Sequence, residues 1–231
     1  SSEQIVKISI MQPTFLPWVG YFKMMILSDL FIFLDDVQFE RRSFQSRNKL
    51  IVGNNEKLIS IPVHVKNRYD QLINQVEINY ESNWIDSHLK TIYFNYSKHK
   101  YFNEIFEIIE KNFRKENKKL IDLNMNIISE ICRYLNIDTK FKLSSTFNIK
   151  KQKSDKILNL ILESGGKQYF TPLRTRDYLK DGEIFKQNGI ELFFFKYDCK
   201  AYNQKNSNKF ISHLSIVDLL FNQGKEAINY L

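Results

Sequence analysis

The chain has 231 residues, of which 43% are hydrophobic and 14% aromatic, a composition that predicts a large folded core and excludes a disordered protein. No apolar run approaches the roughly 20 residues that span a bilayer, and no signal-peptide pattern opens the sequence, so we expect a cytoplasmic protein. The net charge of +8 is spread over dispersed Lys residues without a nucleic-acid-binding motif, which predicts a solvated surface; the alternatives are binding of phosphate-bearing small ligands and, less favoured, of nucleic acid.

Hydrophobic periodicity predicts the secondary structure in chain order. Strands are predicted at 5–11, 30–34, 50–52, 58–63, 75–79, 139–143, 168–171 and 190–197. Helices are predicted at 21–28, 83–95, 101–115, 117–135, 155–163, 176–189 and 216–227. The third and fourth strands flank a Gly/Asn turn and are therefore expected to form a hairpin.

Strands that alternate with helices over short connections predict parallel pairing with right-handed crossovers. We therefore expect an α/β fold with a Rossmann-like mixed sheet that is mostly parallel. The hairpin would be an insertion, and the run of three helices would be a helical insertion in the middle of the chain. Residues 3–231 are predicted to form a single α/β domain, with the helical insertion at about 83–136.

Polar residues follow the first two predicted strands directly. Gln12 stands before Pro13, which ends the first strand, and Asp35 and Asp36 end the second. Ligands of open α/β sheets bind at the carboxyl ends of the strands, so Gln12 is a candidate for substrate binding and both carboxylates are candidates for catalysis. The structural alternatives are a loop tie for Gln12 and a turn or helix cap for the two Asp residues.

Side chains suited to anions lie shortly after this pair. Gln38, Arg41, Arg47 and Asn48 are candidate substrate-binding residues, because Arg side chains bind phosphate and carboxylate groups through two hydrogen bonds. Solvated ion pairing is the alternative for the Arg residues.

The aromatic turn before the first helix supplies further candidates. Gly20 would allow a close backbone approach, and a phosphate could sit at the helix start formed by Gly20 and Tyr21. Trp18 is a candidate for substrate binding, with packing of the turn against the core as its structural alternative.

His64 follows a predicted strand and is the histidine best placed for general acid–base catalysis, ahead of His213. A lone histidine is more often structural, and no pair has the spacing of zinc ligands. Cys132 and Cys199 also lack metal-ligand spacing, and we expect them to be buried or inert thiols.

Taken together, these segments resemble the WbqC-like protein family, and the resemblance covers almost the whole chain in order. It rests on MQP at 11–13, GYF at 20–22, DDVQF at 35–39, RN at 47–48, IP at 61–62, YNQ at 202–204 and LSIVDLLFN at 214–222. Tyr202 and Gln204 become candidate substrate-binding residues through these motifs. Such proteins are associated with gene clusters for bacterial surface polysaccharide (O-antigen) and are described as glycine transferases or acyltransferases acting on amino sugars.

The resemblance implies an enzyme that transfers an acyl or aminoacyl group, glycyl included, to the amine of a nucleotide-linked amino sugar. Its partners would be that sugar and an acyl donor, with acyl-CoA as a candidate cofactor and ATP/Mg²⁺ as a less favoured one. No metal site is predicted, and a homo-oligomer stays open. The alternatives are an ATP-dependent, ligase-like enzyme and a non-catalytic binding protein of the same pathway.

Overall fold

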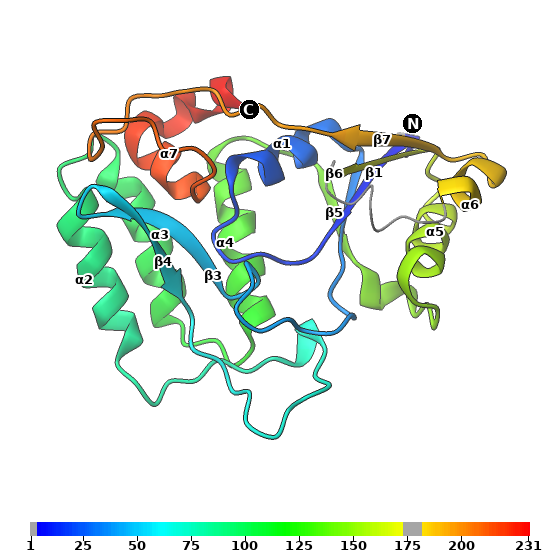
Figure 1. Cartoon of the computed structure of the whole chain (residues 1–231), viewed down its shortest axis with the longest axis horizontal. Coiled ribbons are helices and arrows are strands. Elements are labelled where there is room, and N and C mark those ends of the chain that lie inside the picture. The colour runs from blue at the N-terminus through cyan, green and yellow to red at the C-terminus, as the bar shows by residue number, and fades with distance from the viewer. Residues whose placement is uncertain (1–3, 173–181) are drawn as a thin grey trace. The chain divides into compact units, whose positions relative to one another are not determined.

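The computed structural model describes residues 4–172 and 182–231. Its packing divides the chain into two compact units, whose elements are labelled in Figure 1. Unit 1 contains residues 1–12, 22–36 and 138–198, and unit 2 contains residues 13–21, 37–137 and 199–231. Helix α1 (Val19–Leu27) contains the passage from unit 2 into unit 1.

Unit 1 is built on a five-stranded sheet in the order β5-β2-β1-β6-β7. The strands are β1 (Lys7–Met11), β2 (Leu30–Phe33), β5 (Lys140–Leu143), β6 (Gln168–Pro172) and β7 (Glu191–Phe195). Every pair of neighbouring strands is parallel. The inner strand β2, between β5 and β1, is the apolar run Leu-Phe-Ile-Phe and is wholly buried, as expected of a strand covered on both faces.

Helices α5 (Lys153–Glu163) and α6 (Gly182–Gln187) contribute to the core against one face of this sheet. Their buried side chains Leu160 and Phe185 belong to the same hydrophobic cluster as Ile8 and Ile32 of the central strands. A separate aromatic group on β2 and β5 joins Phe31, Phe33 and Phe141 edge to face. Unit 1 is therefore an α/β sheet with a packed core of its own.

Unit 2 combines a two-stranded antiparallel hairpin with helices (Figure 1). Its elements are β3 (Arg47–Val52), β4 (Asn55–Ser60), α2 (Trp84–Tyr96), α3 (Phe102–Arg114), α4 (Leu120–Tyr134), α7 (Ile216–Gln223) and the 3₁₀ helices η1 (Ile73–Gln75) and η4 (Gly224–Tyr230). The core contains a stack in which Phe221 of α7 lies parallel to Tyr96 and Phe102, at ring-centroid distances of 4.5 and 5.8 Å.

The predicted fold class is confirmed: the protein is α/β, with a mostly parallel sheet, an inserted hairpin and a helical region between the strands. The hairpin forms a sheet of its own. The strand predicted at 75–79 is wrong, because the chain there forms η1 and then only single bridges, from Glu77 to Lys119 and from Ile78 to Val63. Residues 176–181 of the predicted helix at 176–189 lie outside the described residues.

Candidate functional site at the carboxyl edge of the parallel sheet

The strand order of unit 1 reverses between β1 and β6. From β1 the chain proceeds through β2 to β5 on one side, and it then places β6 and β7 on the other. Register aligns Met11, Phe33 and Leu143, so these three strands end at a common edge. Gln12 follows the first of them, half-buried, at the reversal. In open α/β sheets this position is where ligands bind.

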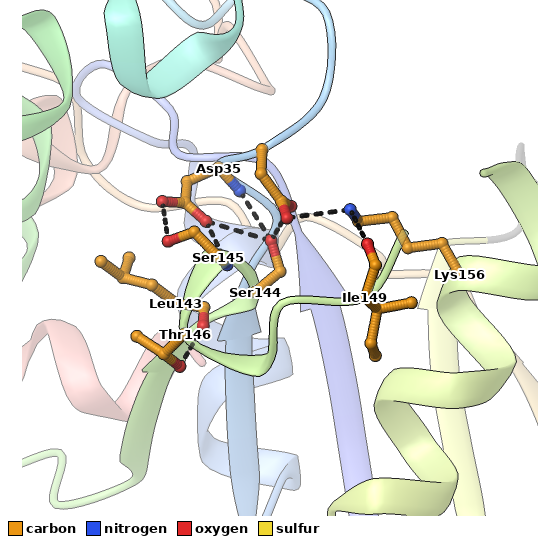
Figure 2. A network of polar contacts seen from close by, with 8 residues as sticks. Asp35, Leu143, Ser144, Ser145, Thr146, Ile149 and Lys156 are labelled. Atoms are coloured by element: carbon orange, nitrogen blue, oxygen red, sulfur yellow. Dashed lines mark hydrogen bonds and ion pairs between the residues drawn. The ribbon is translucent and has the colours of Figure 1, made fainter. Parts of the chain in front are cut away.

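The Asp35 carboxylate at this edge is 1% exposed and holds the turn that follows β5. One oxygen accepts hydrogen bonds from the backbone N–H of Ser145 at 2.8 Å and from the Ser144 hydroxyl at 3.0 Å. The other accepts from the Ser145 hydroxyl at 2.7 Å, and the backbone N–H of Asp35 donates to the Ser144 oxygen (Figure 2). Asp35 therefore links the end of β2 to the turn at Ser144–Phe147.

Asp36 forms an ion pair with Lys156 in the first turns of α5. The Lys156 ammonium lies 2.9 Å from one carboxylate oxygen, and the two side chains are only 7% and 16% exposed. The other carboxylate oxygen of Asp36 accepts a short hydrogen bond from Ser144, and the same ammonium contacts the carbonyl of Ile149 at 3.4 Å (Figure 2). A buried ion pair of this kind is costly to break, because one charge is then left without a partner.

The local sequence explains how this turn forms. Three hydroxyl residues follow β5 directly, and Thr146 donates to the carbonyl of Leu143 at 2.7 Å, which closes the 3₁₀ turn. Asn148 then adopts a left-handed conformation (φ 54°), which Asn tolerates better than most residues. Sequence reasoning missed Ser144, Ser145 and Lys156 as partners of the Asp pair. The Ser-Ser-Thr run after a strand was the available signal for the first two.

The candidate residues are divided between the two units. Unit 1 contains Gln12, Asp35 and Asp36, and unit 2 contains the others, namely Trp18, Gly20, Tyr21, Gln38, Arg41, Arg47, Asn48, His64, Tyr202 and Gln204. Within unit 1 both carboxylates already make strong contacts with the protein. A catalytic role for either one would require it to exchange a present partner for substrate, and that role stays a prediction.

The polar candidates near the hairpin of unit 2 mostly contact the backbone. The Asn48 amide donates to the carbonyl of Phe15 at 3.0 Å and is 2% exposed, while Arg47 lies in β3 and is half-buried. Arg41 and Gln38 are exposed, and their side chains donate to the carbonyls of Val65 and Tyr69. These contacts fix loops, and binding of an anion by the Arg residues stays a prediction.

His64 is half-buried, and its backbone makes two hydrogen bonds. Its N–H donates to the carbonyl of Glu77 at 2.9 Å, and its own carbonyl accepts from the Gln71 amide at 3.2 Å. The backbone of this candidate base is therefore fixed from both sides, and its catalytic role stays a prediction.

The aromatic turn shows why residue 20 is a glycine. A Cβ atom there would lie 2.2 Å from a carbon of the Trp18 ring, so no side chain fits without moving that ring. The same ring stacks on His213, with centroids 5.1 Å apart and planes inclined by 19°. Tyr21 is 1% exposed, and burial raises the pKa of its phenol. Trp18, Gly20 and Tyr21 therefore pack against other residues of the protein, and any contact of theirs with substrate stays a prediction.

Tyr202 and Gln204 surround the buried carboxylate of Asp218 on α7. Tyr202 donates to one Asp218 oxygen at 2.6 Å, and the Gln204 amide donates to the same oxygen at 3.2 Å. Tyr96 donates to the other oxygen at 2.7 Å and accepts from the backbone N–H of Ile51 at 2.9 Å. Burial raises the pKa of Asp218, whereas the three donors oppose that shift. The sequence indicated Asp218 only as part of the LSIVDLLFN motif at 214–222.

The described residues show neither a cluster of metal ligands nor a membrane span. Within residues 4–172 and 182–231, no group of three or more His, Cys, Asp or Glu side chains is placed to hold a metal ion. None of the helices in the same ranges combines the length and the apolar character needed to cross a bilayer.

Comparison with known proteins supplies a family match. The model of the WbqC-like protein family matches residues 12–230. The chain is also 31% identical over 226 residues to a protein of Mycobacterium tuberculosis (strain ATCC 25618 / H37Rv) named "Uncharacterized protein Rv1507c", with 97% of each chain covered. No solved structure matches the chain.

Proposed function

Because the chain belongs to the WbqC-like protein family, we propose that it is a transferase of bacterial surface-polysaccharide (O-antigen) biosynthesis. In this proposal it transfers an acyl or aminoacyl group, such as glycyl, to the amine of a nucleotide-linked amino sugar. The observation that carries the proposal is the carboxyl edge of the parallel sheet, where the strand order reverses beside Gln12 and where the Asp35–Asp36 pair ends the neighbouring strand.

The nucleotide part of the sugar would bind at this reversal. Doubly wound parallel sheets bind nucleotides in the crevice outside the carboxyl ends of the strands that flank the reversal. The Gln12 amide can both donate and accept a hydrogen bond, which suits a base edge or a sugar hydroxyl. The net charge of +8 favours a ligand that carries phosphate groups.

The chemistry requires a group that removes a proton from the sugar ammonium. The free amine then attacks the acyl carbonyl, and the leaving group of the donor departs with a proton. Asp35, Asp36 and His64 remain the proposed candidates for the base. Of the two carboxylates, Asp36 is the less completely buried, and one of its oxygens lies 2.9 Å from the Lys156 ammonium.

A binding assay with a product assay tests the proposal. Wild-type protein is melted with UDP- and dTDP-linked amino sugars, acetyl-CoA, ATP/Mg²⁺ and glycine, and product is sought by mass spectrometry. A nucleotide-linked amino sugar should raise the melting temperature, because a ligand that binds only the folded state stabilises it. Gln12→Ala should reduce that rise, whereas Gln187→Ala, which replaces an exposed Gln on α6, should not. The absence of any rise with these sugars would refute the proposal.

A second candidate is a non-catalytic binding protein of the same pathway. It is favoured by one observation, that both carboxylates of the edge already hold the turn after β5 and the start of α5. It predicts binding of a nucleotide-linked amino sugar without N-acylation by any donor tested, so the product assay separates the two candidates.

A further inference from the structure

Lys156 is a cation that is almost completely enclosed by protein at the carboxyl edge of the parallel sheet. Its side chain is 7% exposed, and its ammonium lies 2.9 Å from a carboxylate oxygen of Asp36 and 3.4 Å from the carbonyl oxygen of Ile149 (Figure 2). A Lys ammonium has three N–H donors. Within residues 4–172 and 182–231 these two oxygens are its acceptors, so one donor is left for the oxygen of a ligand.

The fold brings Lys156 beside the reversal of the strand order. Lys156 lies in the first turns of α5, the helix that leads from the end of β5 back to the start of β6. Leu160 of this helix shares a hydrophobic cluster with Ile8 of β1 and Tyr169 of β6, the two strands between which the order reverses. All these residues belong to unit 1. The beginning of α5 therefore lies at the edge where parallel sheets bind their ligands.

The sequence around Lys156 is basic. Residues 150–156 read Lys-Lys-Gln-Lys-Ser-Asp-Lys, in which Lys150, Lys151 and Lys153 are exposed and Asp155 is the only acid. Clustered positive charges raise the local concentration of anions. An enclosed ammonium with exposed ammonium groups close to it in sequence suits an anion of more than one charge. Phosphate and diphosphate groups are of this kind, and Lys binds them through charge-assisted hydrogen bonds.

The Asp36 carboxylate occupies the position that such an anion would take. One of its oxygens contacts Lys156, and the other accepts a hydrogen bond from the Ser144 hydroxyl. The Asp36 side chain is 16% exposed, so it borders solvent more than Lys156 does. It can turn toward solvent and keep its contact with Ser144 when another anion takes over Lys156. An exchange of this kind leaves neither charge buried without a partner, which would be costly.

We propose that Lys156 binds a phosphate group of the ligand, and that Asp36 occupies this position until the ligand arrives. The inference rests on the proposed binding of a nucleotide-linked sugar at this edge, and it names the residue that receives the diphosphate. The exchange is a competition between two anions for one ammonium and involves no covalent change. It frees one oxygen of Asp36, a candidate base of the proposed transfer, once the phosphate is in place.

A competitor inside the protein lowers the apparent affinity for the ligand. If the Asp36–Lys156 ion pair is formed in about nine of ten molecules without ligand, its removal should tighten binding roughly tenfold. A carboxylate that only supports the fold does not oppose the ligand. Its loss would leave the affinity unchanged or weaken it.

The test is the binding of inorganic pyrophosphate to the full chain. Isothermal titration calorimetry is done without divalent cations at about 0.15 M salt, where exposed charges are largely screened. Asp36→Asn should bind roughly tenfold more tightly than wild type. Asp155→Asn is the matched control, because it removes the same charge from an exposed position next to Lys156, and it should bind like wild type. Addition of Lys156→Met to Asp36→Asn should abolish the gain.

A second measurement does not depend on any variant. Asp36→Asn leaves the enclosed ammonium of Lys156 without its partner, so a melting curve checks whether this variant folds. A crystal structure of the wild type with pyrophosphate shows the exchange directly. It should place a phosphate oxygen within hydrogen-bond distance of the Lys156 nitrogen, with the Asp36 carboxylate turned away.

Four results would overturn the inference. They are equal affinity, or no binding, in wild type and Asp36→Asn; an equal gain in Asp155→Asn; a gain that survives Lys156→Met; and a pyrophosphate complex in which the Asp36–Lys156 pair is intact. The proposed transferase fails separately. Pyrophosphate bound at Lys156, without binding of any nucleotide-linked amino sugar, would refute the transferase and leave the phosphate site standing. N-acylation of a bound sugar with the Asp36–Lys156 pair intact would do the reverse.

Discussion

The phenol of Tyr202 donates a hydrogen bond of 2.6 Å to a carboxylate oxygen of Asp218 that is buried at the start of α7. Tyr96 and Gln204 donate to the same carboxylate, and no described Lys, Arg or His forms an ion pair with it. These hydrogen bonds join the segment that contains Tyr202 and Gln204 to α2 and α7, and all three donors are neutral. Its contribution to stability should therefore respond to pH and to loss of a single hydroxyl.

Burial raises the pKa of Asp218 above its ordinary value of 3.8. Between that value and the raised pKa the folded state binds more protons than the unfolded state, so stability from this group is lost as pH rises. Asp218→Asn should remove this dependence. The free energy of unfolding in urea, measured from pH 4 to pH 8 for both proteins, checks this. Parallel profiles for the two proteins would contradict it.

Removing the Tyr202 hydroxyl should be costly because the carboxylate would lose a strong donor. Tyr202→Phe is expected to destabilise the protein by about 1.5–3 kcal/mol, the range for hydrogen bonds to charged groups. Tyr197→Phe, a change of the same kind outside this group of residues, is the comparison. Urea denaturation of both variants measures the difference, and equal costs would show that the Asp218 contact is not special.

His99 should make the protein sensitive to mild acid. Burial, with a smaller contribution from Lys205, lowers the pKa of its imidazole from 6.5 to about 4. The unfolded state therefore binds the extra proton first, and stability falls as pH drops from 6.5 to about 4. His99→Gln should reduce the loss in free energy of unfolding over this pH range by about 1–3 kcal/mol. Unfolding in urea at pH 7, 5.5 and 4.5 is the measurement, and an unchanged slope would contradict it.

Gly20 and Trp18 should be energetically coupled. Gly20→Ala forces the Trp18 ring to move and is expected to cost about 1–3 kcal/mol, the usual range for overpacking. In a Trp18→Leu background the same change should cost less, because the ring is gone. A double-mutant cycle by urea denaturation measures the coupling. Additive costs would show that the ring does not determine the need for glycine.

The Asp36–Lys156 ion pair should be far more sensitive to loss of one partner than to replacement of both. Lys156→Met leaves a buried carboxylate without its cation and is expected to cost about 3–5 kcal/mol, whereas Asp36→Leu combined with Lys156→Met should cost less. Lys151→Met, at an exposed Lys, is the control and should change stability by under about 0.5 kcal/mol. A double variant less stable than Lys156→Met would contradict this account.

The sheet of unit 1 could be predicted because its strands are apolar runs that end abruptly in polar residues. Leu30–Phe33 has this form, and Gln12 and Asp35 were placed correctly at the ends of their strands. The strand at 75–79 was predicted from local alternation of polar and apolar residues. The segment instead forms η1 and then isolated bridges, and the N–H of Ile78 donates to the carbonyl of Lys118; local alternation cannot distinguish such isolated pairing from a strand.

The partners of the candidate side chains could not be predicted, because they come from distant parts of the chain. Lys156 reads in the sequence as one of several surface lysines, and only the parallel register of β2 and β5 brings the segment after β5 to Asp36. The closeness of Cys199 and His213 likewise depends on how the chain folds back between them. Local patterns fix which residues end a strand, whereas contacts between loops depend on the tertiary fold.

The two units interleave along the chain, which passes from one to the other after residues 12, 21, 36, 137 and 198. Neither unit is therefore a contiguous stretch of the gene. A truncation that extends past residue 12 from the N-terminus, or back past residue 199 from the C-terminus, removes material from both units, so no contiguous fragment contains one complete unit alone. Recombination at a single point likewise cannot exchange one unit for that of another protein. The two units are therefore inherited together, and a substitution in one unit is always expressed in a chain that also contains the other.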